Sequence, residues 1–426
     1  MKSIYKVSQH ESGITIATAE MPHMSSVALG IWVGVGGRYE PAPICGVSHF
    51  IEHMLFKGTR RRNARQISQD VEGIGGYLNA FTTEESTCFY AKAAHDQFEH
   101  VWDVLADMFL NSTFDAMELE KERNVIKEEL AMYLDQPHHQ VQELLNETIW
   151  PDQPLGRALT GTEKSLESLK RADLLGFKQK NYVTRNTLVT FAGSIQHRDA
   201  VKVVSRFASK MRAAHRPVFI PADAKQEAPR LRFHRKATEQ TQLALGIRTC
   251  SRHDDRRFAL RLLNVMLGEN MSSRLFQVVR EDNGLAYSIC SSLGFFDDVG
   301  TLNVSAGVET EKLEKALKLI IGELAIFTQQ LPSRIELRRA RDYIFGQLDL
   351  NLENTENQMT WLGEQYLGYG KVISPEEVKS RIAEVTPSEI RSVARDFFRP
   401  ERLNLAVVSP LRNLRATQPI LSSITV

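Results

Sequence analysis

The stretch that organises this sequence is GVSHFIEHMLFKGT, residues 46–59. Its apolar residues recur three and four positions apart, which is the spacing of one face of an amphipathic α-helix. These apolar residues are Val47, Phe50, Ile51, Met54 and Leu55. The spacing predicts a helix over residues 46–57, with His49 on its first turns.

Two histidines of this helix lie four residues apart, so both imidazoles project from one face and can converge on one ion. Glu52 is close enough to reach a water on that metal without taking a coordination position, as a general base requires. The order H-x-x-E-H is the inverse of H-E-x-x-H and is the inverzincin signature. The ordinary alternative is a structural pair, since two histidines are more often structural than ligating. The motif His49, Glu52 and His53 favours a zinc site.

A catalytic zinc usually has three protein ligands, so a third donor is needed. The best candidate is Glu129, in the segment ERNVIKEEL at residues 122–130. Glu122 and Glu129 lie about two helical turns apart and therefore share a face. The alternative for this segment is a solvated acidic face, because charge runs on helices are usually exposed.

The flanking sequence alternates between strand and helix patterns. Residues 13–19 alternate in polarity and residues 26–34 form a continuous apolar run, which are two forms of strand signal. The other predicted elements are helices at 64–74, 95–111 and 116–133 and strands at 77–83 and 86–93. We expect an α+β chain in which mainly antiparallel sheets are packed with helices.

The second half of the chain resembles the first. LALGI at residues 243–247 echoes VALGI at residues 27–31, and other segments match at a nearly constant offset of roughly 215 residues, as a duplicated domain gives. A proline-containing stretch, residues 213–231, reads as a linker. The sequence therefore predicts an N-terminal domain at 1–212 and a homologous C-terminal domain at 232–426.

The second copy is expected to hold no metal. Opposite His49, Glu52 and His53 it carries Arg261, Asn264 and Val265, and these side chains cannot together bind zinc.

Composition narrows the class of protein. Lys and Arg number 53 against 52 Asp and Glu, so no net charge argues for nucleic acid or an anionic membrane as partner. The four cysteines are widely spaced and indicate neither a disulfide framework nor a thiolate zinc site. Cys45 and Cys88 fall near the motif segments, where a thiol could ligate zinc in principle, but no spacing argument supports this. No run has the length of a signal peptide or a membrane span, so a cytoplasmic protein is expected.

Residues 49–59 followed by residues 122–130 resemble the pitrilysin family of zinc peptidases. Within that family the chain is similar to the processing-peptidase branch, which includes the mitochondrial processing peptidase and its bacterial relatives. The resemblance implies that Glu129 is the third zinc ligand and that Glu122 supports the site from behind the ligands.

Two more segments carry the resemblance. GGYLNAFT, residues 75–82, is similar to an edge strand whose backbone pairs with an extended substrate, which implies that Asn79, Ala80 and Phe81 bind the peptide. Residues 280–288 are similar to the segment that carries an arginine and tyrosine pair. This implies that Tyr287 hydrogen-bonds the oxyanion and that Arg280 holds a substrate carbonyl or carboxylate.

The expected function is therefore zinc-dependent endopeptidase activity on unfolded peptides or presequence-like segments, with Glu52 as general base. Family members of this length work as dimers, which implies a homodimer whose active site is shared between chains. One alternative is a non-catalytic structural or partner subunit of a processing-peptidase-like complex, although such chains would be expected to lack the ligands. Another is a different enzyme with the same motif, such as S-ribosylhomocysteine lyase, but that family is far shorter and has no duplicated half.

Overall fold

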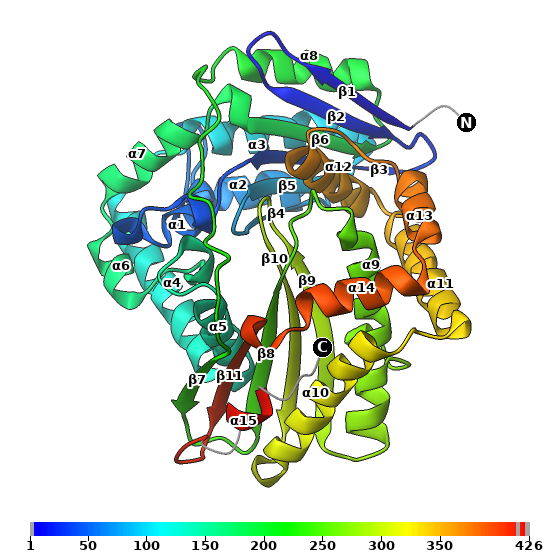
Figure 1. Cartoon of the computed structure of the whole chain (residues 1–426). Coiled ribbons are helices and arrows are strands. Elements are labelled where there is room, and N and C mark those ends of the chain that lie inside the picture. The colour runs from blue at the N-terminus through cyan, green and yellow to red at the C-terminus, as the bar shows by residue number, and fades with distance from the viewer. Residues whose placement is uncertain (1–3, 415–417, 422–426) are drawn as a thin grey trace. The chain divides into compact units, whose positions relative to one another are not determined.

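Two β-sheets with matching strand orders form the framework of the chain (Figure 1). The computed structural model describes residues 4–414 and 418–421. The first sheet has the order β1-β2-β6-β3-β5-β4 and the second the order β7-β11-β8-β10-β9. Each sheet belongs to its own compact unit. The first unit comprises Met1–Ala131, Arg157–Ile220 and Asp349–Ile373, and the second comprises Met132–Gly156, Pro221–Leu348 and Ser374–Val426.

The first sheet is mainly antiparallel. Its strands are β1 (Tyr5–Gln9), β2 (Thr15–Glu20), β3 (Ser26–Val33), β4 (Tyr77–Thr82), β5 (Thr87–Ala94) and β6 (Thr187–Gly193). The pair β2 and β6 is parallel, and the other neighbouring strands are antiparallel. Strand β4 pairs with β5 alone and so forms one edge of the sheet.

The second sheet repeats this pattern without a counterpart of β1. Its strands are β7 (Arg230–Arg235), β8 (Thr241–Thr249), β9 (Ala286–Phe295), β10 (Gly300–Val308) and β11 (Leu403–Ser409). Here β7 and β11 are the parallel pair. Strands β2 and β7 begin 215 residues apart, at Thr15 and Arg230. The predicted α+β fold with two homologous domains is confirmed.

Helices cover the first sheet on the side that forms the main core of the first unit. They are α1 (Val47–Leu55), α2 (Ala64–Glu72), α3 (Phe98–Asn111), α4 (Ala116–Asp135), α6 (Glu163–Ser168), α7 (Arg171–Asn181) and α8 (His197–Ala208). The core joins side chains of β3 and β5 to those of α1 and α3, including Leu29, Phe89 and Phe50. Burial of such side chains is the dominant stabilising term.

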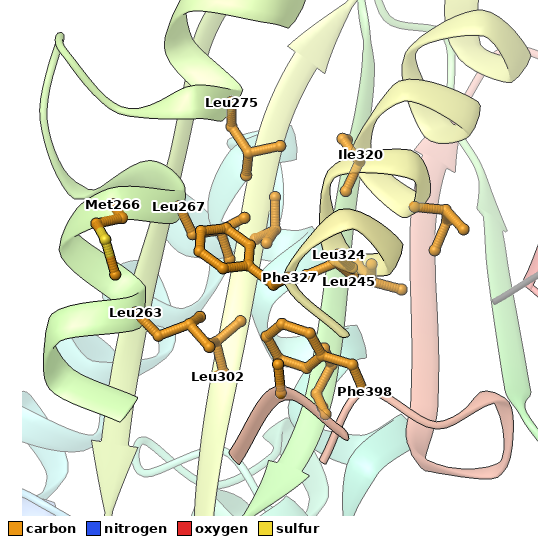
Figure 2. Packing of buried hydrophobic residues seen from close by; sticks show 14 of the residues in the cluster. Leu245, Leu263, Met266, Leu267, Leu275, Leu302, Ile320, Leu324, Phe327 and Phe398 are labelled. Carbon is orange, nitrogen blue, oxygen red and sulfur yellow. The ribbon is translucent and has the colours of Figure 1, made fainter. Parts of the chain in front are cut away.

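The second unit has a core of the same kind (Figure 2). Its helices are α5 (Pro137–Ile149), α9 (Arg256–Asn264), α10 (Leu313–Gln329), α11 (Arg334–Asn351), α13 (Pro375–Glu384), α14 (Pro387–Phe397) and α15 (Gln418–Leu421). Phe327 of α10 and Leu263 of α9 meet Leu302 of β10 in the middle of this core, and all three are fully buried.

Each unit contains one helix from the half of the sequence that forms most of the other unit. Helix α12 (Thr355–Tyr369) lies on β6 and β3 of the first sheet, where Met359 and Leu362 pack against Trp32. Helix α5, from the first half of the sequence, lies on β11 and β8 of the second sheet. The compact units are therefore not continuous halves of the chain. The boundaries 1–212, 213–231 and 232–426 stay a prediction about the two sequence repeats.

The glycine shared by the two repeated strands has a packing reason. A Cβ on Gly30 would lie 2.6 Å from Sδ of Met359 on α12, and a Cβ on Gly246 would collide with Ile149 of α5. Only glycine permits such close approach of a helix to a strand. The repeat VALGI and LALGI thus marks where the exchanged helices rest.

Local boundaries differ slightly from expectation. The helix predicted at 64–74 ends at Glu72, because Gly73 forms its C-cap, and Arg230 and Leu231 of the expected linker already belong to β7. The two compact units divide at Ile220 and Pro221, within the 213–231 segment. Among the helices that the structure describes, none combines the length and the apolar character needed to span a bilayer.

Candidate metal centre

Helix α1 starts from a tightly built turn. Gly46 precedes it with a φ of 90°, in the left-handed region that favours glycine. The carboxylate of Glu40 accepts hydrogen bonds from the backbone N–H groups of Gly46 (2.6 Å) and Ser48 (2.7 Å). Glu40 is buried, and this burial raises its pKa to about 7 in opposition to the two hydrogen bonds. The first donors of α1 are therefore satisfied inside the protein rather than by water.

The apolar face of α1 holds the helix against the core. Phe50, Ile51 and Met54 are fully buried, and each contributes roughly 1.5–3 kcal/mol by its burial. His49 and His53 are partly buried. Their rings stand 4.6 Å apart between centroids, in an edge-to-face arrangement.

Glu129 of α4 meets these two histidines. Its Oε2 lies 3.8 Å from Nε2 of His49 and 3.6 Å from Nε2 of His53. One ligand atom from each of the three residues lies within 4.8 Å of the others. In the part of the chain that the structure describes, this is the one group of His, Cys, Asp or Glu side chains that meets this criterion.

The donor set fits a zinc ion. Zinc binds imidazole nitrogen and carboxylate oxygen at about 2.0–2.2 Å, so ligand atoms around a tetrahedral ion lie roughly 3.3–3.6 Å apart. The separation of Glu129 Oε2 from His53 Nε2, 3.6 Å, lies at the upper end of this range, and its separation from His49 Nε2, 3.8 Å, lies slightly beyond it. Two histidines and one glutamate leave a fourth position for water, as in catalytic rather than structural zinc sites.

His49 is held in the form that a metal requires. Burial, followed by the neighbouring His53, lowers the pKa of His49 to about 4, although the charge of Glu129 opposes the shift. The imidazole is therefore neutral at physiological pH, and only neutral imidazole can donate its lone pair to a metal.

Glu122 lies behind His53. Its Oε2 is 3.1 Å from Nδ1 of His53, and its Oε1 is 2.7 Å from Nζ of Lys57. Burial would raise the pKa of Glu122, but the hydrogen bonds from His53 and Lys57 outweigh it and hold this pKa below the ordinary value. A carboxylate at Nδ1 places the imidazole hydrogen there and leaves Nε2 free to face Glu129.

Glu52 takes part in a different contact. Its Oε2 accepts a hydrogen bond of 2.5 Å from Oγ1 of Thr82, the last residue of β4. Burial raises the pKa of Glu52, and the Thr82 hydrogen bond opposes this shift. A carboxylate with a raised pKa is a better proton acceptor near neutrality.

The three predicted peptide-binding residues lie on edge strand β4. Asn79 is exposed, and its Oδ1 accepts a hydrogen bond of 2.8 Å from the N–H of Ala80. Phe81 points to the opposite face from Thr82 and packs edge-to-face on Trp32, 5.4 Å between centroids. The position of β4 at a sheet edge is established, whereas peptide binding by these residues stays a prediction.

Arg280 and Tyr287 lie in the second unit. Arg280 is on a π-helical turn (Phe276–Glu281), with its guanidinium carbon 5.4 Å from the ring centroid of Tyr287. Tyr287, near the start of β9, is 78% exposed. The two side chains are thus neighbours, and their roles toward a substrate stay predictions.

Other residues around α1 were not anticipated from the sequence. The positions of Glu40 and Thr82 in the sequence show no recognisable spacing relative to the motif, because folding alone brings each of them to α1. Cys45 and Cys88 are buried, and neither belongs to the cluster of metal-ligating atoms.

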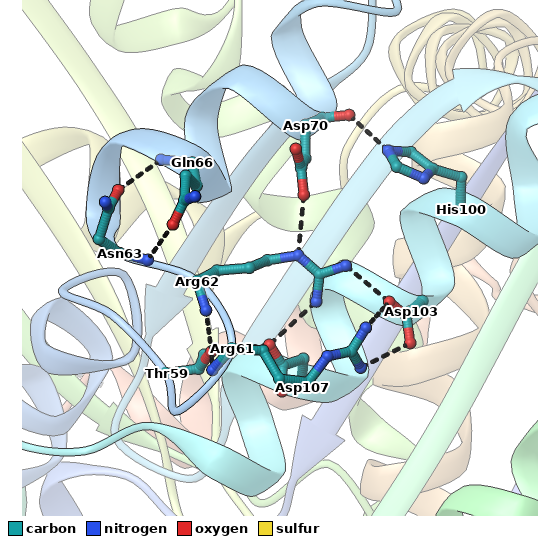
Figure 3. Close-up of polar contacts among 9 residues, drawn as sticks. All are labelled: Thr59, Arg61, Arg62, Asn63, Gln66, Asp70, His100, Asp103 and Asp107. Carbon is teal, nitrogen blue, oxygen red and sulfur yellow. Dashed lines mark hydrogen bonds and ion pairs between the residues drawn. The ribbon is translucent and has the colours of Figure 1, made fainter.

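A network of ion pairs also steadies the segment that follows α1 (Figure 3). Arg62, just before α2, contacts Asp70 of α2 at 2.8 Å and Asp103 and Asp107 of α3 at 2.6 and 3.0 Å. Arg61 pairs with Asp103 as well, at 2.7 Å. The network ties α2, which packs against β4, to α3.

Family models match both halves of the chain. A model described as insulinase, peptidase family M16, matches residues 15–163. A second model, described as peptidase M16 inactive domain, matches residues 168–344. The zinc-motif helix and Glu129 fall within the first match, and Arg280 and Tyr287 fall within the second.

Curated relatives cover nearly the whole chain. The uncharacterized zinc protease YmxG of Bacillus subtilis is 36% identical over 95% of this chain and 98% of its own length. A protein of Streptomyces coelicolor, also named an uncharacterized zinc protease, is 35% identical over 95% of this chain and 90% of its own length.

Solved structures agree on the fold. The crystal structure of a protease from Helicobacter pylori matches with a TM-score of 0.89 at 19% identity, over 95% of this chain and 99% of that one. A structure from Pseudomonas fluorescens, titled as a peptidase M16 inactive domain, has the same TM-score and identity, over 96% of this chain and 99% of that one.

Proposed function

Because the chain belongs to the insulinase family of peptidases, family M16, we propose that it is a zinc-dependent endopeptidase that cleaves unfolded peptides or presequence-like segments. The observation that carries this proposal is the convergence of His49 and His53 of α1 with Glu129 of α4, together with the presence of Glu52 on the helix of the two histidines. The proposal includes membership of the processing-peptidase branch.

The chemistry follows from these side chains. A bound zinc ion would supply a Lewis acid that polarises the scissile carbonyl and lowers the pKa of a water. Glu52 takes the proton of the attacking water and returns it to the leaving amine. Glu122 keeps the His53 ring oriented, so that Nε2 of His53 stays directed toward the proposed metal position.

The proposed substrate is an extended peptide that adds a strand to β4. An edge strand presents unpaired backbone groups, and pairing through the main chain accepts many sequences. Asn79, Ala80 and Phe81 would contribute backbone groups to this pairing, and the N–H of Ala80 would exchange its hydrogen bond to Asn79 Oδ1 for one to the peptide. This explains why unfolded segments, rather than folded proteins, are the expected substrates.

The experiment that tests the proposal is hydrolysis of a mixed library of unfolded peptides by the purified chain and by Glu52→Gln, with zinc quantified in both. The substitution keeps the shape of the side chain and removes its basicity. Cleavage by the wild type, and none by a variant that still holds one zinc per chain, supports the proposal.

Two other results of that experiment have different meanings. Equal cleavage by both proteins would remove Glu52 from the mechanism. Zinc in both with cleavage by neither would favour a non-catalytic partner subunit of a processing-peptidase-like complex.

We also propose a homodimer in which Arg280 and Tyr287 act on the peptide bound by the other chain. The exposure of Tyr287 and its stacking with Arg280 leave the pair available to such a peptide. Mixing Glu52→Gln with Tyr287→Phe tests this, because a mixed dimer would contain one site with both groups intact. Recovered cleavage in the mixture, from two variants that are each inactive, is expected. No recovery in a mixture shown to contain mixed dimers would contradict shared sites.

A further inference from the structure

The side chain of Glu52 is anchored at its far end by a residue from a different element. Oγ1 of Thr82 donates a hydrogen bond of 2.5 Å to Oε2 of Glu52, across 30 positions of sequence. Hydrogen bonds to charged acceptors are shorter and stronger than those between neutral groups. This contact therefore influences where the carboxylate of Glu52 rests.

The geometry of β4 directs the side chain of Thr82 toward the face of the sheet that α1 covers. Side chains alternate along β4, and Leu78 and Ala80 pack on the core that contains α1. Thr82 continues this register toward α1, whereas Phe81 points the other way onto Trp32. The branched side chain of threonine has few rotamers, so the direction of its hydroxyl is narrowly defined.

The helix alone does not define the position of the carboxylate. Burial of Phe50 and Ile51 fixes the backbone of α1, but a glutamate side chain keeps rotatable bonds beyond its Cβ, and these retain considerable conformational freedom. A second anchor at the carboxylate removes that freedom. A general base must lie within hydrogen-bond reach of the proton that it takes, so the anchor has a direct bearing on turnover.

The strand that carries this anchor is held firmly. Thr82 pairs with Thr87 of β5, and the buried hydroxyl of Thr87 donates a hydrogen bond of 2.9 Å to the carbonyl of Val35. The same strand β4 is the edge to which the peptide would add. Residues of β4 would thus contact both Glu52, the proposed general base, and the backbone of the substrate.

We propose that Thr82 is a positioning residue: its hydroxyl sets the carboxylate of Glu52 at a defined distance from a peptide paired with β4. This inference rests on the proposed peptidase function. It assigns Thr82 no contact with the reacting atoms, and it predicts an effect on kcat rather than on KM, because the backbone edge of β4 stays unchanged.

The test compares Thr82→Val, which removes the hydroxyl but keeps the branched shape, with Thr82→Ser, which keeps a hydroxyl. Thr82→Val should lower kcat roughly tenfold to a hundredfold with KM unchanged, the size of effect expected of a misplaced catalytic group. Thr82→Ser should stay close to wild type. Zinc content should equal that of the wild type in both.

Thr18→Val is the matched control. Thr18 is a buried threonine on β2 of the same sheet, and its hydroxyl bonds His197 at 2.9 Å, away from Glu52. Replacing Thr18 by valine is the same chemical change as Thr82→Val, and it should leave kcat unchanged. An equal loss of kcat in Thr18→Val and Thr82→Val would assign the effect to general damage and overturn the proposal.

Crystal structures of the two Thr82 variants give a readout that does not depend on turnover. The carboxylate of Glu52 should leave its position in Thr82→Val and keep it in Thr82→Ser. An unmoved carboxylate in Thr82→Val, or an unchanged kcat, overturns the proposal. If the zinc-loaded wild type cleaves nothing, the peptidase function fails instead, and the crystal structures still decide whether Thr82 positions Glu52.

Discussion

Helices α1 and α9 follow the equivalent strands β3 and β8 of the two units, and each has a glutamate facing its polar side. On α1, His49 and His53 face Glu129 with their nitrogens and oxygen 3.6–3.8 Å apart. On α9, the guanidinium of Arg261 instead pairs directly with Glu269, with Nη2 and Oε1 2.7 Å apart. Asn264 completes this second cluster by donating a hydrogen bond of 2.7 Å to Glu269.

The difference concerns where the positive charge comes from. The second unit contains its own cation, covalently attached as Arg261, so Glu269 is already neutralised. The first unit brings together a carboxylate and two imidazoles, one of which, His49, is kept neutral by burial. Such a cluster gains most from an external cation. The same framework can therefore carry a closed ion pair or a metal site, depending on a few side chains.

Removal of the carboxylate proposed as the third zinc ligand should have the greatest effect. Glu129→Gln should abolish detectable turnover and lower zinc affinity by more than about a hundredfold, since even partners outside the ligand set are worth roughly 10- to 100-fold. Zinc content after dialysis against a chelator measures this. Glu128→Gln, an exposed neighbour on the same helix, is the control and should retain zinc. Full zinc retention by Glu129→Gln would exclude Glu129 as a ligand.

A smaller effect is expected from Glu122→Gln. This change keeps the shape of the side chain but weakens the hydrogen bonds from His53 and Lys57. Zinc affinity should fall roughly 10- to 100-fold, measured by competition with a chromophoric chelator. Glu120→Gln, which alters an exposed carboxylate paired with Arg123, should leave affinity unchanged. Equal affinities in all three proteins would remove Glu122 from the site.

Acid should destabilise the metal-free first unit through His49. Its folded pKa is about 4 and its ordinary value is 6.5, so between these values the unfolded chain binds a proton that the folded chain does not. The stabilising contribution is therefore present above pH 6.5 and is lost as the pH falls toward 4. The free energy of unfolding should fall by about 1–3 kcal/mol over this range.

Urea unfolding of chelator-treated protein measures this dependence on pH. His49→Gln should show a shallower decline between pH 6.5 and pH 4. An identical decline in wild type and variant would locate the responsible group elsewhere.

The smallest effect is expected in the second unit. Arg261→Met keeps the apolar stem and removes the cation, which should lower the free energy of unfolding by about 1 kcal/mol, because the pair is partly exposed. Zinc content and turnover should not change. Arg261→Met/Glu269→Gln should recover part of the stability, because neither partner is then left as an unpaired charge. Zinc loss in Arg261→Met would contradict the prediction that only the first unit holds the metal.

Much of the framework could be predicted because its signals are local. The helix at 46–57 appears as α1, and the strands at 77–83 and 86–93 appear as β4 and β5 with ends shifted by one residue. The family inferred from residues 49–59 and 122–130 is confirmed by the family models and the relatives. The duplication was visible because strands with the same burial requirements recur at a fixed offset.

Other features carried no local signal. The exchange of α5 and α12 between the units depends on which apolar sheet face each helix packs against. The periodicity within a helix does not indicate which sheet that is. Glu40 and Thr82 reach α1 from separate segments, so their side chains looked like ordinary polar residues of a loop and a strand. The end of the helix at Glu72 and the start of β7 at Arg230 are ends of elements, where one glycine or one strand pair decides the last residue.

Local sequence patterns predict the zinc-motif helix, the placement of His49, Glu52 and His53 along it, and the duplicated α+β framework. These depend on helical and strand periodicity, which act over a few residues. The contacts of Glu129 with both histidines, of Glu122 with His53 and of Thr82 with Glu52 arise from the folding of the whole unit. Each of these contacts joins residues tens of positions apart, and the packing of whole elements sets their distances.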